Sequence, residues 1–98
     1  MEYLSDKEIL EILGKKLKQI RLNENYTQQF VADKIGIDRA TLSLIENGHN
    51  TTLTNFIKLL RVYKKVDELN TLLYLPKYNV MEMLKLEKKR KKNASHKR

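Results

Sequence analysis

The chain has 98 residues and contains no cysteine, no tryptophan, one proline and three glycines. Without cysteine, it has no disulfide, no thiolate metal site and no cysteine nucleophile. Its apolar runs are short and interrupted by charged residues, which argues against a membrane-spanning helix. The first ten residues, MEYLSDKEIL, lack the basic start and the apolar stretch of a signal peptide. We therefore expect one small domain in the cytoplasm.

Residue types that carry out catalysis are also scarce. The two histidines, His49 and His96, have no carboxylate at the spacing of a metal site. Serines and threonines fall at expected helix caps and turns, with no partner base indicated. The glycines do not form a phosphate-binding loop. The sequence thus predicts a protein that is not an enzyme, with no catalytic residues, no metal and no cofactor.

Positive charge is concentrated at the C-terminus. Residues 1–84 hold 12 Lys and Arg against 11 Asp and Glu, a net charge of +1, whereas residues 85–98 hold 8 against the single Glu87, a net charge of +7. A basic segment of this kind suits nucleic acid or an acidic partner, and it is also compatible with a plain solvated tail.

The first helix is predicted from Ser5, because the sequence SDKE is a capping box with Ser5 as N-cap and Glu8 three residues later. Apolar residues then recur at helical spacing as far as Leu22. Gly14 interrupts this run and favours a bend or a helix in two parts. The segment NENY, residues 23–26, ends the helix.

Two short helices are predicted next. Thr27 is a good N-cap for QQFVADKI, and Gly36 ends that helix in a left-handed conformation that only glycine adopts cheaply. Asp38 caps the following helix, and Asn47-Gly48 closes it. No segment has the period of a β-strand, so the sequence predicts an all-α fold.

Three further helices complete the pattern. The fourth is capped by Thr51 or Thr52 and has a broad apolar face that begins at Leu53. The fifth, DELNTLLYL, stops at Pro76. A basic sixth helix begins near Asn79. We expect a compact five-helix domain over residues 1–76 and a basic helical extension over residues 77–98.

The segment from Thr27 to Gly48 has the spacing of a helix-turn-helix, in which a helix, a glycine turn with an apolar residue after it, and a second helix follow one another. Ala32 is small where the two helices would cross, and Leu42 and Ile45 would anchor the second helix from behind. That helix, residues 38–47, would lie in the major groove of DNA with its first residues at base edges.

These residues carry a family resemblance. YTQQFVADKIGIDRATLSLIENG resembles the Xre/Cro-type helix-turn-helix regulators of phages and bacteria, and the similarity extends through LGKKLKQIR and TLTNFIKLLRVY, over roughly residues 13–75. KIGIDRATLSLIEN and HNTTLTNFIKLL are especially similar to the HipB-like antitoxins. The resemblance implies a lambda-repressor-like fold, binding of double-stranded DNA in the bacterial nucleoid, and, for the narrower group, a HipA-type kinase toxin as partner.

Arg39 is the leading candidate for base recognition, because it opens the second helix and arginine pairs bidentately with guanine. A phosphate contact or pairing with Asp38 is the alternative. Ala40 would face a thymine methyl group, and Ser43 lies one turn after Arg39. Leu44 departs from the family pattern, where a polar or basic residue is usual. It would either contact thymine methyl groups or be partly covered by protein.

The resemblance also implies which residues hold the DNA backbone. These expected phosphate contacts are Thr27, Gln28, Thr41, Asn50 and Thr51. Thr41 is equally suited to packing against the preceding helix. In the family, residues at the positions of Arg21 and Glu46 form a structural ion pair, which we expect here as well.

Recognition of a two-fold operator requires two copies of the helix. The predicted fifth helix is more apolar than a core of this size needs, and it offers Leu69, Leu72, Leu73 and Tyr74 for a homodimer interface or for the monomer's own core. The basic segment is open to three interpretations: a DNA-binding arm, an amphipathic helix for a partner protein, or a solvated tail.

Overall fold

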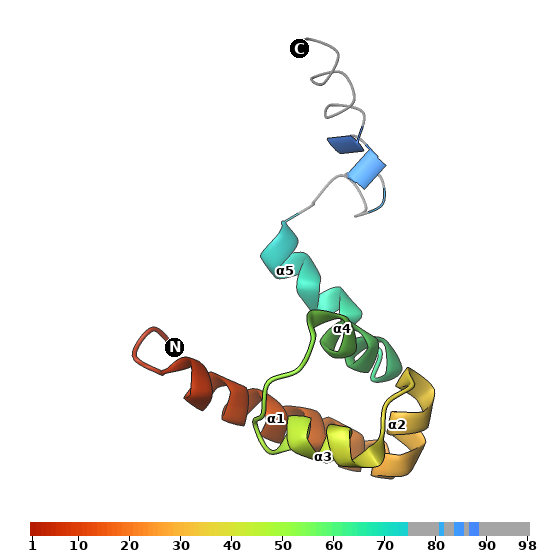
Figure 1. Ribbon diagram of the computed structural model, residues 1–98. Helices are drawn as coiled ribbons and strands as arrows, with labels where there is room; N and C mark the ends of the chain where they lie inside the picture. The colour runs from red at the N-terminus through yellow and green to blue at the C-terminus, as the bar shows by residue number, and fades with distance from the viewer. Residues whose placement is uncertain (75–80, 82–83, 86, 89–98) are drawn as a thin grey trace, which may run out of the picture. The chain divides into compact units, whose positions relative to one another are not determined.

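In the computed structural model, the described residues are 1–74, 81, 84–85 and 87–88. They contain no β-strand, and the predicted all-α fold with five helices is confirmed (Figure 1). The elements are α1 (Asp6–Asn23), α2 (Gln28–Ile35), α3 (Arg39–Glu46), α4 (Leu53–Val62), the 3-10 helix η1 (Val66–Glu68) and α5 (Leu69–Leu73). The predicted stop at Pro76 and most of the predicted sixth helix fall outside the described residues.

The chain divides into two compact units, Met1–Val66 and Asp67–Arg98. The first unit holds α1 to α4 and therefore the whole helix-turn-helix. The expected division into residues 1–76 and 77–98 stays a prediction. None of the helices in the described part of the chain has the length and apolar content needed to cross a membrane.

Helix α1 begins with the predicted capping box, in which the Glu8 amide donates to Ser5 Oγ (3.1 Å) and the Ser5 amide donates to Glu8 Oε1 (3.0 Å). The expectation of a helix in two parts is wrong, because α1 runs unbroken through Gly14. A Cβ at Gly14 would lie 2.6 Å from the carbonyl oxygen of Ile45. The glycine therefore permits close approach of α1 and the end of α3.

The other helix ends follow from local sequence. Thr27 and Thr52 cap α2 and α4, each accepting a 3.0 Å hydrogen bond from the backbone amide three residues later. Gly36 ends α2 with a φ of 76°, a left-handed conformation that glycine adopts without cost. Asp38 occupies the N-cap position of α3, but its side chain makes no capping hydrogen bond, so the expected carboxylate cap is wrong.

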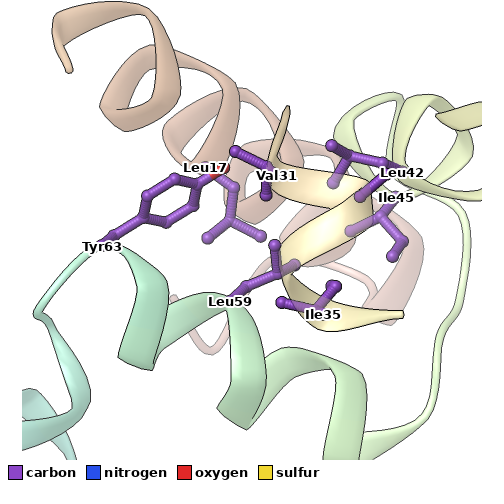
Figure 2. Packing of buried hydrophobic residues seen from close by; sticks show 8 residues of the cluster. Leu17, Val31, Ile35, Leu42, Ile45, Leu59 and Tyr63 are labelled. Carbon is purple, nitrogen blue, oxygen red and sulfur yellow. The ribbon is translucent and has the colours of Figure 1, made fainter. Parts of the chain in front are cut away.

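The core lies where α2 packs against both α3 and α4, while α3 also packs along α1. Figure 2 shows side chains of all four helices meeting there, with Val31, Leu42 and Leu59 fully buried. Ala32 is completely buried too, which fits its predicted place at the helix crossing. Leu22 and Leu53, at the ends of the apolar faces predicted for the first and fourth helices, are instead exposed, by 48% and 75%, because they lie at the last turn of α1 and the first residue of α4.

Candidate nucleic-acid interface

The turn between α2 and α3 is held by backbone hydrogen bonds. The Gly36 and Ile37 amides both donate to the carbonyl oxygen of Ala32, the latter at 3.0 Å. Ile37 is half-buried and packs against the core. Since the turn is fixed at both its glycine and its apolar residue, the start of α3 is presented in one orientation relative to α2.

Helix α3 has two distinct faces. Leu42, Ile45 and Glu46 are buried against the rest of the first unit. The opposite face, which we call the reading face, consists of the residues predicted for base recognition: Arg39, Ala40, Ser43 and Leu44. Arg39, Ala40 and Leu44 are exposed and Ser43 is half-buried. Their spacing of three and four residues places them on one side of the helix.

Leu44 is 50% exposed, so protein covers about half of its surface and leaves the other half open. It lies one turn after Ala40, and the two together make an apolar strip along the reading face. Of the two alternatives stated for the sequence, partial cover by protein is therefore observed, and contact with thymine methyl groups stays a prediction.

A buried ion pair joins the end of α3 to α1. Arg21 Nε donates to Glu46 Oε2 at 2.7 Å, and Arg21 Nη2 donates to Glu46 Oε1 at 3.1 Å. The third nitrogen of the same guanidinium group, Arg21 Nη1, donates to the carbonyl oxygen of Tyr26 at 2.9 Å. Hydrogen bonding to Glu46 raises the pKa of Arg21 above its ordinary value. This is the pair that the family resemblance implied, and its bidentate geometry fixes the base of α3.

Gln28 connects this ion pair to the reading face. Its Nε2 donates to Glu46 Oε1 at 3.0 Å, and its Oε1 accepts from Arg39 Nη1 at 3.2 Å. The guanidinium of Arg39 is thereby held beside the first turn of α2. Within the described residues Arg39 makes no ion pair with Asp38, the alternative that the sequence had left open.

Tyr63 completes the surroundings of the ion pair. Its ring belongs to the core, and its hydroxyl is buried without a hydrogen-bond partner among the described residues. Burial, reinforced by the negative charge of Glu46, raises the pKa of Tyr63 to about 12. The phenol therefore stays neutral near the carboxylate at physiological pH.

The residues expected at DNA phosphates lie on α2, α3 and the loop before α4. Thr27 is exposed, Thr41 is half-buried, and the Thr27 hydroxyl is already engaged as a cap. In the loop, Asn50 Oδ1 accepts from the Thr51 amide at 2.9 Å, and Thr51 Oγ1 accepts from Asn55 Nδ2 at 3.1 Å. These bonds order the loop and leave the side-chain amide of Asn50 free to donate within the described structure.

In the second unit, the apolar residues of α5 are largely open to solvent. Leu72 is 80% and Tyr74 78% exposed, Leu73 is also exposed and Leu69 is half-buried. The described residues contain no cluster of three or more side chains suited to holding a metal ion.

Sequence reasoning missed the bridging role of Gln28. The residue was expected at a phosphate because of its place at the start of α2, and nothing local indicates that its amide reaches residues 11 and 18 positions away. The sequence also did not indicate that the Tyr63 hydroxyl lacks a hydrogen-bond partner among the described residues, because a tyrosine within an apolar face is typical of an ordinary core residue.

The second helix of this helix-turn-helix buries one face, is held in place by an ion pair and exposes its other face. This arrangement defines the class of helix-turn-helix DNA-binding regulators. The chain belongs to the helix-turn-helix family, whose model matches residues 17–69.

Two curated relatives carry the similarity further. The chain is 46% identical over 50 residues to antitoxin HipB of Escherichia coli strain K12, a match that covers 50% of this chain and 57% of that protein. It is 44% identical over 50 residues to antitoxin HipB of Escherichia coli O6:H1, covering 50% of this chain and 53% of that protein. The chain thus spans about half the length of the curated relatives it matches. The predicted Xre-type, HipB-like character is confirmed.

Proposed function

We propose that the chain is a sequence-specific transcriptional repressor that binds a palindromic operator as a homodimer. The observation that carries this proposal is the reading face of α3. Its apolar and cationic side chains are exposed, whereas the opposite face is anchored by Leu42, Ile45 and the ion pair of Glu46. A helix anchored in this way keeps its outward residues in a fixed register against base edges.

In this proposal Arg39 pairs with a guanine, which is worth about 1–3 kcal/mol of discrimination against other bases. Ala40 and Leu44 contact thymine methyl groups, and Ser43 donates to a base or phosphate. Each of these groups is available on the exposed or half-exposed side of α3.

Five residues hold the backbone of the duplex: Thr27, Gln28, Thr41, Asn50 and Thr51. Gln28 suits this role because its amide group has two donor hydrogens, of which Glu46 takes one. The second remains for a phosphate oxygen. Asn50 offers its amide group from the loop, close to the N-terminus of α4, where backbone amides also favour an anion.

The homodimer would be formed through Leu69, Leu72, Leu73 and Tyr74. The support for this is the exposure of Leu72 and Tyr74, since a helix that leaves such large apolar side chains in water gains free energy by covering them. We retain residues 77–98 as a separate basic extension that adds phosphate contacts, each contributing about −0.9 to the salt dependence of the logarithm of the binding constant.

The test is selection of binding sites from a random duplex library, followed by gel shifts with the selected site. We expect a palindromic consensus and a loss of about 1–3 kcal/mol of specificity in Arg39→Ala at its guanine. The Lys15→Ala variant, altered at an exposed position on α1, is the control. Recovery of no preferred sequence, with weak salt-sensitive binding alone, would rule the proposal out.

A second function is favoured by the similarity to the two HipB antitoxins, in which the chain neutralises a HipA-type kinase toxin and regulates its own promoter secondarily. A variant truncated after Leu84 distinguishes the repressor function from the antitoxin function. Loss of operator affinity and of salt dependence identifies the basic segment as a DNA-binding arm. Unchanged DNA binding together with loss of kinase binding identifies it as the antitoxin element.

A further inference from the structure

A cavity of about 350 Å³ lies in the first unit, between α1, the end of α3 and the start of α4. It lies apart from the reading face, and the proposed function leaves it unexplained. Its apolar lining consists of Leu10, Leu13, Leu17, Ile45, Leu53 and Phe56. No Lys, Arg, Asp or Glu side chain lines it.

Polar groups line the cavity on one side only. They come from the loop between α3 and α4, residues His49 to Thr52. An apolar wall with a few polar groups gathered at one end is the composition of a site for a small molecule. Charged ligands are disfavoured, because such a lining offers no counter-charge for a desolvated ion.

The size of the cavity suits a small molecule. Its volume of about 350 Å³ falls within the usual volume range of ligand pockets.

The walls of the cavity are held by close contacts. A Cβ at Gly14 would lie 2.7 Å from the Glu46 carbonyl oxygen, and a Cβ at Gly48 would lie 2.9 Å from the Cα of Glu11. The backbone of α1 therefore touches both the end of α3 and the beginning of the loop. Since these contacts are between backbones, the pocket is formed before any ligand arrives.

We propose that this cavity binds a small, neutral, mainly apolar molecule with one polar group, and that its occupancy weakens operator binding. The polar group of the ligand meets Asn50 and Thr51, which the proposed function assigns to DNA phosphates. A ligand hydrogen-bonded to them competes with those contacts. The regulatory step rests on the proposed function, whereas the binding of the small molecule does not.

Binding is tested with 1-naphthol as the probe and with 1-naphthoate and 1-naphthylmethylammonium as its anionic and cationic counterparts. Amide chemical shifts of the full-length protein are followed by NMR. We expect saturable changes at Gly14 and His49 with 1-naphthol, and binding at least about tenfold weaker for either ion. Absence of saturable binding, as when a second copy or the C-terminal segment fills the pocket, would overturn the proposal.

Two variants that fill the cavity from opposite walls, Leu10→Trp and Leu53→Trp, test the location. The matched control is Ile12→Trp, because Ile12 is an exposed residue of the same helix that does not line the cavity. Both filling variants should weaken 1-naphthol binding at least about tenfold, while the control binds as the wild type does. Leu53 is largely exposed, so its variant keeps the test valid if Leu10→Trp does not fold. Equal binding by all variants would place the probe elsewhere and refute the site.

The coupling is measured by gel shifts with the selected operator. Saturating 1-naphthol should raise the operator dissociation constant of the wild type at least about threefold and leave that of Leu10→Trp unchanged. An unchanged or tightened operator complex, with probe binding intact, would refute the coupling alone. Failure to bind any operator, with probe binding intact, would instead count against the proposed function.

Discussion

Gly14 of α1 lies directly against the backbone of Glu46 at the end of α3, so closely that a Cβ at residue 14 would lie 2.7 Å from the Glu46 carbonyl oxygen. This contact brings together the two helices that the ion pair of Arg21 and Glu46 also joins. The position of the reading helix therefore depends on the absence of one methyl group.

Gly14→Ala is expected to lower stability in spite of the better helix propensity of alanine. The propensity gain is about 1 kcal/mol, but the clash is with backbone atoms that cannot rotate away, and overpacking of this kind costs about 1–3 kcal/mol or more. Urea denaturation measures the difference. Lys15→Ala, at an exposed neighbouring position, should be nearly neutral. A Gly14→Ala variant more stable than the wild type would contradict the close contact.

Removing one partner of the buried ion pair is expected to be costly. Glu46→Ala leaves the Arg21 guanidinium buried without its carboxylate, and breaking such a pair costs about 3–5 kcal/mol. The double variant Arg21→Met/Glu46→Ala should lose much less than the sum of the two single changes. Thermal denaturation at several salt concentrations provides the measurement. A single-variant cost below about 1 kcal/mol would mean that the pair behaves as an exposed one.

Gln28→Ala is expected to affect both stability and DNA binding, because Gln28 links Glu46 to Arg39. We expect operator affinity to fall about tenfold, the equivalent of one charge-assisted hydrogen bond. Gln29→Ala is the matched control on the same helix, since Gln29 bonds only to Asp33 in the described structure. Equal losses in the two variants would show that the bridge to Arg39 contributes nothing.

Tyr63→Phe is expected to be neutral or stabilising, up to about 1 kcal/mol. The hydroxyl is buried without a partner in the described part of the chain, and an unsatisfied buried polar group is destabilising. Unfolding by urea at neutral pH tests this expectation. A loss above about 1 kcal/mol would show that the hydroxyl is in fact satisfied.

The same residue predicts an alkaline effect. The folded-state pKa of Tyr63 is raised to about 12 from an unfolded value near 10. Because the folded-state pKa lies above the unfolded one, the contribution of Tyr63 to the free energy of unfolding is fully present below about pH 10. It is lost as the pH rises toward about 12. The phenolate absorbance of wild type minus Tyr63→Phe should therefore show its midpoint near pH 12. A midpoint at the ordinary value would contradict the burial.

Much of the fold is accessible to sequence reasoning, because helix starts depend on residues three positions apart. Ser5 with Glu8, and the caps at Thr27 and Thr52, are examples of this local control. The same reasoning failed at Asp38, where a suitable side chain occupies the N-cap without bonding to the helix. Residue type indicates which groups can cap a helix, whereas the rotamer of the side chain decides whether one does.

The candidate site also has one part that local sequence predicts and one part that it does not. The outward positions of α3, Arg39, Ala40, Ser43 and Leu44, follow from helical period once Leu42 and Ile45 are assigned to the core. The bridge from Glu46 through Gln28 to Arg39 does not, because it joins both ends of one helix through the side chain of another.

The sequence by itself determined where α1 to α4 lie, the caps at Ser5, Thr27 and Thr52, and the helix-turn-helix spacing, because these depend on backbone hydrogen bonds and apolar period within a few residues. Tertiary structure alone decided that Gly14 serves a close helix contact, that Gln28 braces Arg39, and that a cavity remains between α1 and α4. These features arise where residues far apart in the chain meet, and the fit of side-chain volumes across helices sets them.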